Sequence, residues 1–172
     1  MTQAMVRLEF AEHKRCDLQD GINSSLHAEI SPSVLIANGL ELEDQQRRLR
    51  ADRKASSQNP TDNQKAKIQM RSNALHRKLD AWVQVQILYM SAVASLHIRA
   101  QHDDSPQDKL PEDFILLLPS QLNPTTPCAL LLCQIEWKLR YAQADDALND
   151  VHQNIHLHAH LNTFKTLHIH GQ

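Results

Sequence analysis

The chain has 172 residues, a formal net charge of −2 and a hydrophobic content of 41%, with only 3 glycines. The near-neutral charge is not the overall basic signature of a nucleic-acid-binding protein, and no apolar run approaches the ~20 residues of a membrane span. Leu, Ala, Gln and Asp are the commonest residues and Arg is also frequent, which is a composition typical of helices. We therefore expect an all-α fold, built as a helical bundle or intramolecular coiled coil, with no membrane partner.

Two helices are expected in an N-terminal helical segment at residues 1–55. The first covers 2–20, ends at Gly21, which supplies a left-handed C′ position, and carries three apolar residues on one face: Leu8, Ala11 and Leu18. The second begins at Ser31-Pro32 and directs five apolar side chains inward: Val34, Leu35, Leu40, Leu42 and Leu49. Gly39 costs up to ~1 kcal/mol relative to Ala inside a helix, so a kink or break is expected there.

A long helix is expected at 61–101, in a segment that covers 56–102 and begins with a polar loop. Thr61 and Gln64 can form a capping box at its start. Its seam has alternating spacings of four and three residues: Leu75, Leu79, Trp82, Gln86, Tyr89, Val93, Leu96 and Ala100. We interpret the polar member, Gln86, as an edge position; a register-setting polar contact is the alternative.

The segment 103–126 is expected to be a connection that packs on the bundle. A continuous helix is excluded by its prolines and the one that follows: Pro106, Pro111, Pro119, Pro124 and Pro127. A solvated acidic turn is expected at its start, formed by His102, Asp103, Asp104 and Asp108. The apolar run at 114–118 has no second strand candidate to pair with, so we expect it to pack across the helices rather than in a sheet.

The last segment, 127–172, is expected to form one long helix from Pro127 to His170, capped by Thr126. One coiled-coil stripe on it consists of Trp137, Tyr141, Ala144, Leu148, Val151 and Ile155. A second stripe lies beside it: Leu132, Ile135, Leu139 and Ala142. We expect this helix to pack antiparallel to the helix at 61–101 in a single domain, with Trp82 and Trp137 in the core between them.

Few residues suggest chemistry. His152, His156 and His160 share one helical face at i,i+4, a spacing compatible with a metal, although we favour a solvated polar face. Asp145 and Asp146 diverge around the helix and are interpreted as solvated surface. No Ser has the flanking glycines of a nucleophile elbow, and three glycines cannot build a phosphate loop. We expect no enzymatic activity, no metal and no cofactor.

The three cysteines, Cys16, Cys128 and Cys133, are odd in number and lack CxxC spacing, so we expect reduced, buried thiols in an intracellular protein. Charged residues occur early, from Arg7 onward, and no apolar h-region is present, so a signal peptide is not expected.

Basic residues form two groups. The first consists of Arg47, Arg48, Arg50, Arg53 and Lys54, and the second of Lys65, Lys67, Arg71, Arg77 and Lys78. If the loop at 55–63 brings the two helices together, these groups form a basic patch that can contact phosphates without reading sequence. We favour the alternative, a solvated charged surface.

The segment at 135–148, IEWKLRYAQADDAL, resembles the C-terminal region of fungal KDZ-type (Kyakuja–Dileera–Zisupton) transposases. Further pieces agree with the family in the same order: 31–36, 39–49, 82–90, 118–120 and 170–172. The resemblance covers most of the chain from Val6 onward. Two departures are Ser91, where the family often has Pro, and the C-terminal histidines, where relatives tend to carry Arg.

The resemblance implies a fragment without the catalytic core, because the RNase H-like core of such transposases lies upstream of the matching region. No catalytic residue is carried over to this chain, and a nuclear location is implied. Two functions are compatible with this picture. One is a non-catalytic helical interaction module that serves assembly, by self-association or by association with a larger transposase-like protein. The other is an accessory, non-specific DNA-binding module that acts through the basic patch.

Overall fold

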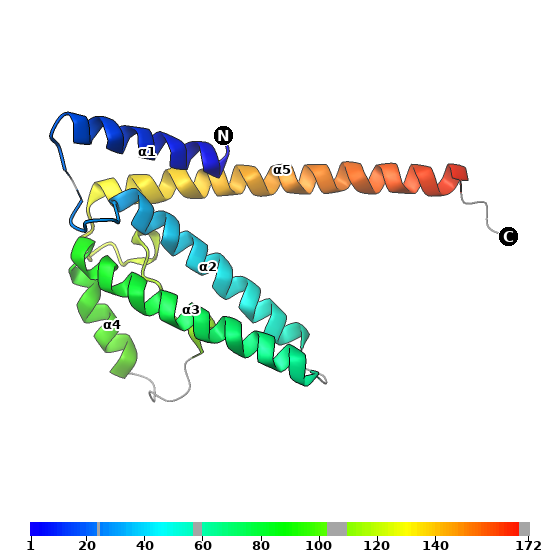
Figure 1. Cartoon of the computed structure of the whole chain (residues 1–172), viewed down its shortest axis with the longest axis horizontal. Helices are drawn as coiled ribbons and strands as arrows, with labels where there is room; N and C mark the ends of the chain where they lie inside the picture. Colours follow the sequence, from blue (N-terminus) through cyan, green and yellow to red (C-terminus); the bar gives the residue numbers. More distant parts are fainter. Residues whose placement is uncertain (24, 57–59, 103–109, 169–172) are drawn as a thin grey trace. The chain divides into compact units, whose positions relative to one another are not determined.

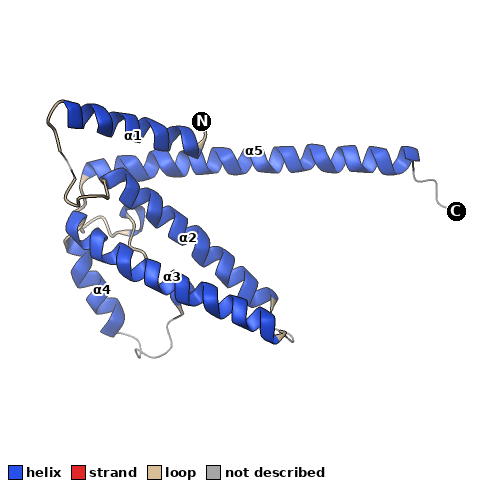
Figure 2. Cartoon of the chain, viewed as in Figure 1, coloured by secondary structure: helices blue, strands red, loops and turns tan. Residues whose placement is uncertain are grey.

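The computed structural model describes residues 1–23, 25–56, 60–102 and 110–168 (Figure 1). Its elements, in order, are α1 (Gln3–Gln19), α2 (Pro32–Ala55), α3 (Asp62–Tyr89), α4 (Ala92–His102), the 3-10 turns η1 (Pro111–Asp113) and η2 (Pro119–Gln121), and α5 (Leu130–His168). Within the described ranges every regular element is helical and there is no strand (Figure 2). The predicted all-α fold is confirmed.

The chain divides into two compact units, each of which is described by itself. The larger unit is Asp17–Glu136, and the smaller unit combines Met1–Cys16 with Trp137–Gln172. Helix α5 therefore begins in the larger unit and continues in the smaller one. Among the residues described, no helix is both long enough and apolar enough to cross a membrane.

Helix α1 ends as the sequence predicts. Gly21 has a φ of 76°, which is the left-handed region that glycine adopts without steric cost. The N–H of Gly21 donates to the carbonyl of Leu18 at 3.2 Å, and that of Ile22 donates to the carbonyl of Asp17 at 2.7 Å. This pair of bonds is the Schellman arrangement, and it satisfies two carbonyls that the helix end leaves without a partner.

Helices α2 and α3 form an antiparallel pair at the centre of the larger unit (Figure 1). Ser31 caps α2 by accepting from the N–H of Val34, and the capping box between Thr61 and Gln64 opens α3 as predicted. The buried side chains of the pair follow the predicted faces: Leu35, Leu40, Leu42 and Leu49 on α2, and Leu75, Leu79, Trp82 and Gln86 on α3. One residue was placed wrongly, because Val34 in the first turn of α2 is 41% exposed.

Gly39 does not break α2; the expected kink or break was wrong. The helix continues through it from Pro32 to Ala55. A β-carbon built on Gly39 would lie 2.8 Å from Cζ2 of Trp82 and 2.8 Å from Cδ2 of Leu118. The glycine is thus the place where the indole of α3 and the connection approach the backbone of α2.

The long helix expected at 61–101 is divided into α3 and α4. Met90 leaves helical geometry with φ −136° and ψ 70°, and its N–H makes a last helical bond to Gln86 at 2.8 Å. Val93 and Ala94 then make tighter bonds to Met90 and Ser91, at 3.0 and 3.3 Å. Met90, Val93 and His97 are buried, whereas the predicted seam members Tyr89 and Leu96 are half-buried. The buried positions keep spacings of four and three residues across the break, so the pattern of apolar residues does not reveal it.

Helix α5 begins at Leu130, three residues after the expected Pro127. Thr126 therefore lies four residues before the helix and does not cap it; its N–H donates to the carbonyl of Asn123 at 2.8 Å and closes a turn. The predicted end at His170 and the acidic residues Asp103, Asp104 and Asp108 lie outside the described residues. The acidic turn and the exact end of the helix therefore stay predictions.

The connection after α4 is held by side chains from three helices. From α2, Gln46 donates to the carbonyls of Pro111 and Phe114 at 2.9 and 2.8 Å. From α3, Gln86 donates to the carbonyls of Leu116 and Leu117 at 2.9 and 3.0 Å. From α5, the buried Glu136 accepts from the backbone N–H and the hydroxyl of Ser120 at 2.8 and 2.6 Å. The run at 114–118 packs across the helices as predicted, with Leu116 and Leu118 buried.

Gln86 was interpreted wrongly as an edge residue. It is fully buried, and its carbonyl oxygen lies 3.1 Å from Nε2 of His97 on α4. Leu117, whose carbonyl Gln86 binds, has a φ of 54°, which is a strained backbone for a residue with a side chain. The amide therefore joins α3, α4 and the strained point of the connection, and it is the alternative, a buried polar contact, that the structure shows.

In the smaller unit, α1 lies beside α5 and runs in the opposite direction (Figure 1). Lys138 donates to Glu9 at 3.0 Å and lies 5.5 Å from the centre of the Phe10 ring. About two turns further along α5, Asp146 accepts from the backbone N–H of Gln3 at 2.8 Å, and Asp145 pairs with the amino group of Met1. A carboxylate at the start of a helix is favourable, so these aspartates hold α1 rather than forming only a solvated surface.

Candidate functional site

The most distinctive surface of the chain is an apolar stripe on α5, formed by Trp137, Tyr141, Ala144, Leu148, Val151 and Ile155. The five large members are 56–69% exposed. They were expected to lie in the core, and that placement was wrong, for Trp137 in particular. The neighbouring stripe of Leu132, Ile135, Leu139 and Ala142 is the one that is buried. Of the two apolar stripes that the sequence predicts, only one is therefore buried.

The exposed stripe is ordered along one helix face. The rings of Trp137 and Tyr141 stack with their centres 5.7 Å apart and an angle of 22° between their planes. Beside them, Lys138 donates a hydrogen bond to Glu9 of α1, so the stripe lies next to the face of α5 that α1 covers. Farther along α5, Leu157, Leu161 and Phe164 are also more than half exposed. Large apolar patches on a soluble protein mark interaction sites.

The two groups of basic residues do converge, because α2 and α3 pack antiparallel. Arg71 on α3 pairs with Asp52 on α2, and Lys78 donates to Oε1 of Gln45 at 3.1 Å. Residues of the two groups thus lie on neighbouring helices that pack together. What the arrangement offers to a phosphate depends on how many of these cations already have partners.

Most of the predicted basic patch is neutralised within the chain. Arg48 lies 2.7 Å and Arg47 3.9 Å from Asp44, and Lys65 lies 3.6 Å from Asp62. Arg50 binds Asp113 at 3.2 Å and Arg53 pairs with the buried Glu112, so both hold η1 against α2. Arg77 donates to the carbonyl of Asn73 at 3.3 Å. Lys54 and Lys67 alone have no hydrogen bond or ion pair within the described part of the chain.

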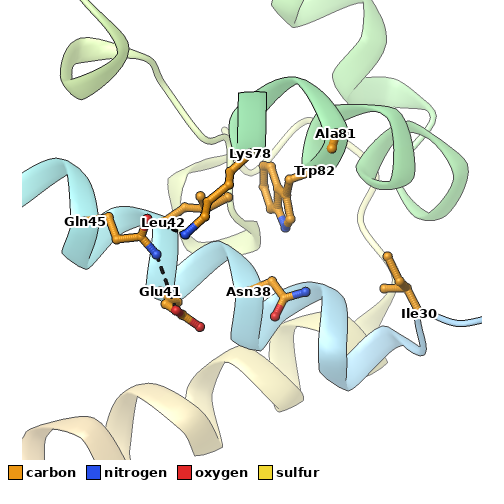
Figure 3. Close-up of a pocket in the computed structure, with 8 residues that line it drawn as sticks. All are labelled: Ile30, Asn38, Glu41, Leu42, Gln45, Lys78, Ala81 and Trp82. Atoms are coloured by element: carbon orange, nitrogen blue, oxygen red, sulfur yellow. Dashed lines mark hydrogen bonds between the residues drawn. The ribbon is translucent and has the colours of Figure 1, made fainter. Parts of the chain in front are cut away.

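A groove of about 310 Å³ lies between α2 and α3 (Figure 3). Its lining residues are Ile30, Asn38, Glu41, Leu42, Gln45, Lys78, Ala81 and Trp82. Gln45 links the polar groups there, accepting from Lys78 and donating to Glu41 at 3.3 Å. The indole N–H of Trp82 donates to the carbonyl of Leu35 at 2.9 Å. These lining residues do not include a nucleophile with an adjacent base, which acid–base or covalent catalysis would require.

The C-terminal histidines are arranged more closely than the sequence implies. His152 and His156 face each other, with their Nε2 atoms 2.7 Å apart. No group of three or more His, Cys, Asp or Glu side chains suited to a metal occurs among the described residues. His160, the third member of the predicted face, is exposed on the next turn of α5.

The cysteines differ from one another. Cys16 is exposed, so it was wrongly expected to be buried, whereas Cys128 and Cys133 are half-buried with their sulfur atoms 3.9 Å apart. Burial, followed by the hydrogen bond with Cys133, raises the pKa of Cys128 to about 12. A thiol in this state is a poor nucleophile, because only the thiolate reacts.

Sequence reasoning missed the polar residues that position the connection. Gln46, Glu112 and Glu136 are all buried: Gln46 and Glu136 bind the segment 111–120, and Glu112, which belongs to that segment, pairs with Arg53 of α2. Each of these polar residues lies within or next to a run of apolar residues. The sequence does not distinguish them from surface residues, because their hydrogen-bond partners are far away in the chain. No protein-family model, no curated protein and no solved structure matches the chain.

Proposed function

We propose that the protein is a non-catalytic helical interaction module that serves assembly, and that the exposed stripe of α5 is its contact surface. The observation that carries this is the exposure of Trp137, Tyr141, Leu148, Val151 and Ile155 along one face of a continuous helix. Alternating spacings of four and three residues are those of a coiled-coil seam, which needs a partner helix to bury it.

The partner that fits the stripe is a second copy of this chain, with the two α5 helices antiparallel. In that alignment Trp137 faces Ile155, Tyr141 faces Val151, and Ala144 faces Leu148 of the other copy. Every layer then combines a larger side chain with a smaller one, which fills a seam evenly. A parallel alignment would place Trp137 on Trp137 and Ala144 on Ala144, which leaves one layer crowded and another one empty.

The size of the stripe agrees with a modest dimer interface. The five large side chains expose roughly 600 Å², near the ~800 Å² that each partner buries in a standard interface. Residues 137–155 extend over about 28 Å at ~1.5 Å per residue, which is short for a coiled coil. We therefore expect a dissociation constant in the micromolar range, about −8 kcal/mol. An interface of this kind is closed by its two-fold symmetry and stops at the dimer.

Sedimentation equilibrium across a concentration series tests this proposal. The unmodified chain should show a reversible monomer–dimer equilibrium, and the double variant Leu148→Glu/Ile155→Glu should remain a monomer. The matched control is Asn149→Glu/Gln153→Glu, which places the same charges on exposed positions off the stripe and should still dimerise. A chain that stays monomeric at about 100 μM, some hundred times the expected 1 μM constant, would contradict self-association; the stripe would then serve a different, larger partner.

Cross-linking tests the orientation in a background in which Cys16, Cys128 and Cys133 are replaced by Ala. A mixture of Ala144→Cys and Leu148→Cys chains should form a disulfide between them, and Ala144→Cys chains alone should not. Efficient cross-linking of Ala144→Cys alone would instead indicate the parallel alignment.

The resemblance to the C-terminal region of KDZ-type transposases supports the same role, since that region lies outside the catalytic core. The break between α3 and α4 falls at Met90–Ser91, where the family often has Pro, a residue that ends helices. We propose on this basis that the module derives from a transposase-like protein, acts inside the nucleus and has no catalytic activity of its own. Metal-dependent nicking of DNA by the purified chain would contradict this.

Non-specific DNA binding through the basic patch remains the second proposal, and the convergence of the two basic groups favours it. The ion pairs within the patch weaken it, because a cation held by a carboxylate releases fewer counterions from DNA. Lys54→Glu/Lys67→Glu, which alters two cations without partners, should abolish any salt-dependent affinity and leave the fold intact. Binding that survives this change would rule out the basic patch as the contact surface, and absence of binding at low salt in the unmodified chain would remove DNA as a partner.

A further inference from the structure

Two imidazoles on the exposed surface of α5 lie close enough together to act as a bidentate ligand. His152 and His156 are separated by one helical turn, and their ring centres lie 4.6 Å apart with an angle of 18° between the planes. Their Nε2 atoms are closer than the ring centres, at 2.7 Å, so the two nitrogens lie on the facing edges of the rings. The two nitrogens therefore face each other across one short gap.

The separation of the two nitrogens matches cis ligands of one metal ion. His nitrogen binds transition metals at ~2.0–2.1 Å, so two ligands at a right angle are about 2.9 Å apart, and two at a tetrahedral angle about 3.3 Å apart. The observed 2.7 Å is nearer the first value. Right angles between nitrogen ligands are characteristic of tetragonal Cu²⁺ and Ni²⁺, whereas Zn²⁺ prefers the tetrahedral arrangement.

The surroundings suit a cation. No Lys or Arg occurs in the sequence between Arg140 and Lys165, whereas Asp150 lies two residues before His152. Both rings are on exposed positions of a continuous helix, so a metal can reach them without any rearrangement of the backbone. Without a metal the pair shares a hydrogen bond in which one Nε2 donates and the other accepts, so a metal that binds both nitrogens requires the donor's proton to be released or moved to Nδ1.

We propose that His152 and His156 form a chelating site for a divalent transition metal of tetragonal preference, with Cu²⁺ bound more tightly than Zn²⁺. Water completes the coordination, since the described residues offer no third side-chain ligand of the usual types at this point. The ion links two successive turns of α5 and so stabilises the helix that carries the exposed stripe. This proposal does not rest on the proposed self-association, because neither histidine belongs to the stripe.

Titration of the full chain with Cu²⁺, Ni²⁺ and Zn²⁺ separately, followed by calorimetry at pH 7.5, tests the proposal. His152→Gln and His156→Gln should each weaken Cu²⁺ binding by about tenfold or more, as expected for the loss of a ligand. The matched control is His158→Gln, which removes a histidine two residues away, on another side of the helix, and should leave the affinity unchanged. Acidification to pH 5 should abolish binding, because protons compete for the same nitrogens.

Circular dichroism supplies a second readout, since saturating Cu²⁺ should raise the melting temperature of the helical signal in the unmodified chain and not in His156→Gln. The proposal is overturned if both His152→Gln and His156→Gln leave the affinity unchanged. It is equally overturned if His158→Gln weakens binding as much as they do, which would indicate a diffuse affinity of the many histidines rather than a defined pair.

Discussion

The indole of Trp82 occupies the space that a side chain at residue 39 would need. A β-carbon on Gly39 would lie 2.8 Å from Cζ2 of Trp82, closer than carbon atoms approach in folded proteins. The same β-carbon would meet Leu118, so α2, α3 and the connection are in contact at one point of the backbone. The sequence predicted a kink or break of the helix at Gly39. Instead, three parts of the larger unit are in contact at this glycine.

Gly39→Ala is expected to destabilise the protein, although the same change in an exposed helix would stabilise it by ~0.8–1 kcal/mol. Overpacking of a filled core typically costs 1–3 kcal/mol, so the clash outweighs the helix propensity. Urea unfolding followed by circular dichroism measures the difference. Asn38→Ala is the control: it is adjacent and exposed, and it should be neutral or slightly stabilising. A Gly39→Ala protein more stable than the parent would show that the indole can move aside.

The two tryptophans are expected to behave differently. Trp82 is 6% exposed and Trp137 is 67% exposed, so acrylamide should quench Trp137 readily and Trp82 hardly at all. Each indole can be followed alone in Trp137→Phe and Trp82→Phe proteins. Trp82→Ala should lower the free energy of unfolding by ~3–5 kcal/mol, whereas Trp137→Ala should change it by less than about 0.5 kcal/mol in the monomer. Equal quenching of both indoles would contradict this assignment.

The helices of the chain are largely predictable from sequence, because their signals are local. The stop at Gly21, the cap at Ser31 and the capping box at Thr61 each depend on residues within one turn. The buried face of α3 was predicted by spacing alone. These features need no knowledge of what lies opposite the helix.

What sequence could not predict is which apolar face is covered. Both stripes of α5 satisfy a helical period, and only the packed structure shows that Leu139 is buried while Trp137 is exposed. Gln86 is indistinguishable in sequence from a surface glutamine, because its partners are backbone carbonyls thirty and thirty-one residues away. The same holds for the basic groups, because the carboxylates that pair with Arg50 and Arg53 belong to η1, far away in the sequence.

His97 makes stability depend on pH. Burial lowers the pKa of His97, whose ring is stacked on Phe114 with centres 5.3 Å apart and whose Nε2 donates to Gln86. Since the folded state binds this proton less readily than the unfolded state, its contribution is present above the unfolded value of about 6.5 and is lost as the pH falls below it.

Unfolding free energies measured from pH 7.5 to 5.5 should therefore fall less steeply in His97→Gln, which keeps a donor for Gln86 but cannot take up a proton. The control is His76→Gln, which removes an exposed imidazole that lies 3.6 Å from Asp80 and should not reduce the slope. If His97→Gln and the parent have the same slope, the acid sensitivity of the protein arises elsewhere.

The thiols are expected to react in a fixed order, with Cys16 first and Cys128 much later. Cys16 is exposed, whereas the pKa of Cys128 is raised to about 12 by burial and by its hydrogen bond with Cys133. At pH 8 a thiol with that pKa is ionised to about one part in 10⁴, and alkylation rates follow the thiolate fraction. Iodoacetamide labelling followed by peptide mass spectrometry should modify Cys16 at least about tenfold faster than Cys128. Labelling in urea provides the control, because unfolding removes the burial and should make the two rates similar.

Because the folded state holds the proton of Cys128 more tightly, this thiol should also reduce stability as the pH rises from 9.0 toward about 12. Cys133→Ala removes one cause of the raised pKa and should speed the labelling of Cys128. Equal rates for Cys16 and Cys128 in the native protein would contradict the arrangement at the start of α5.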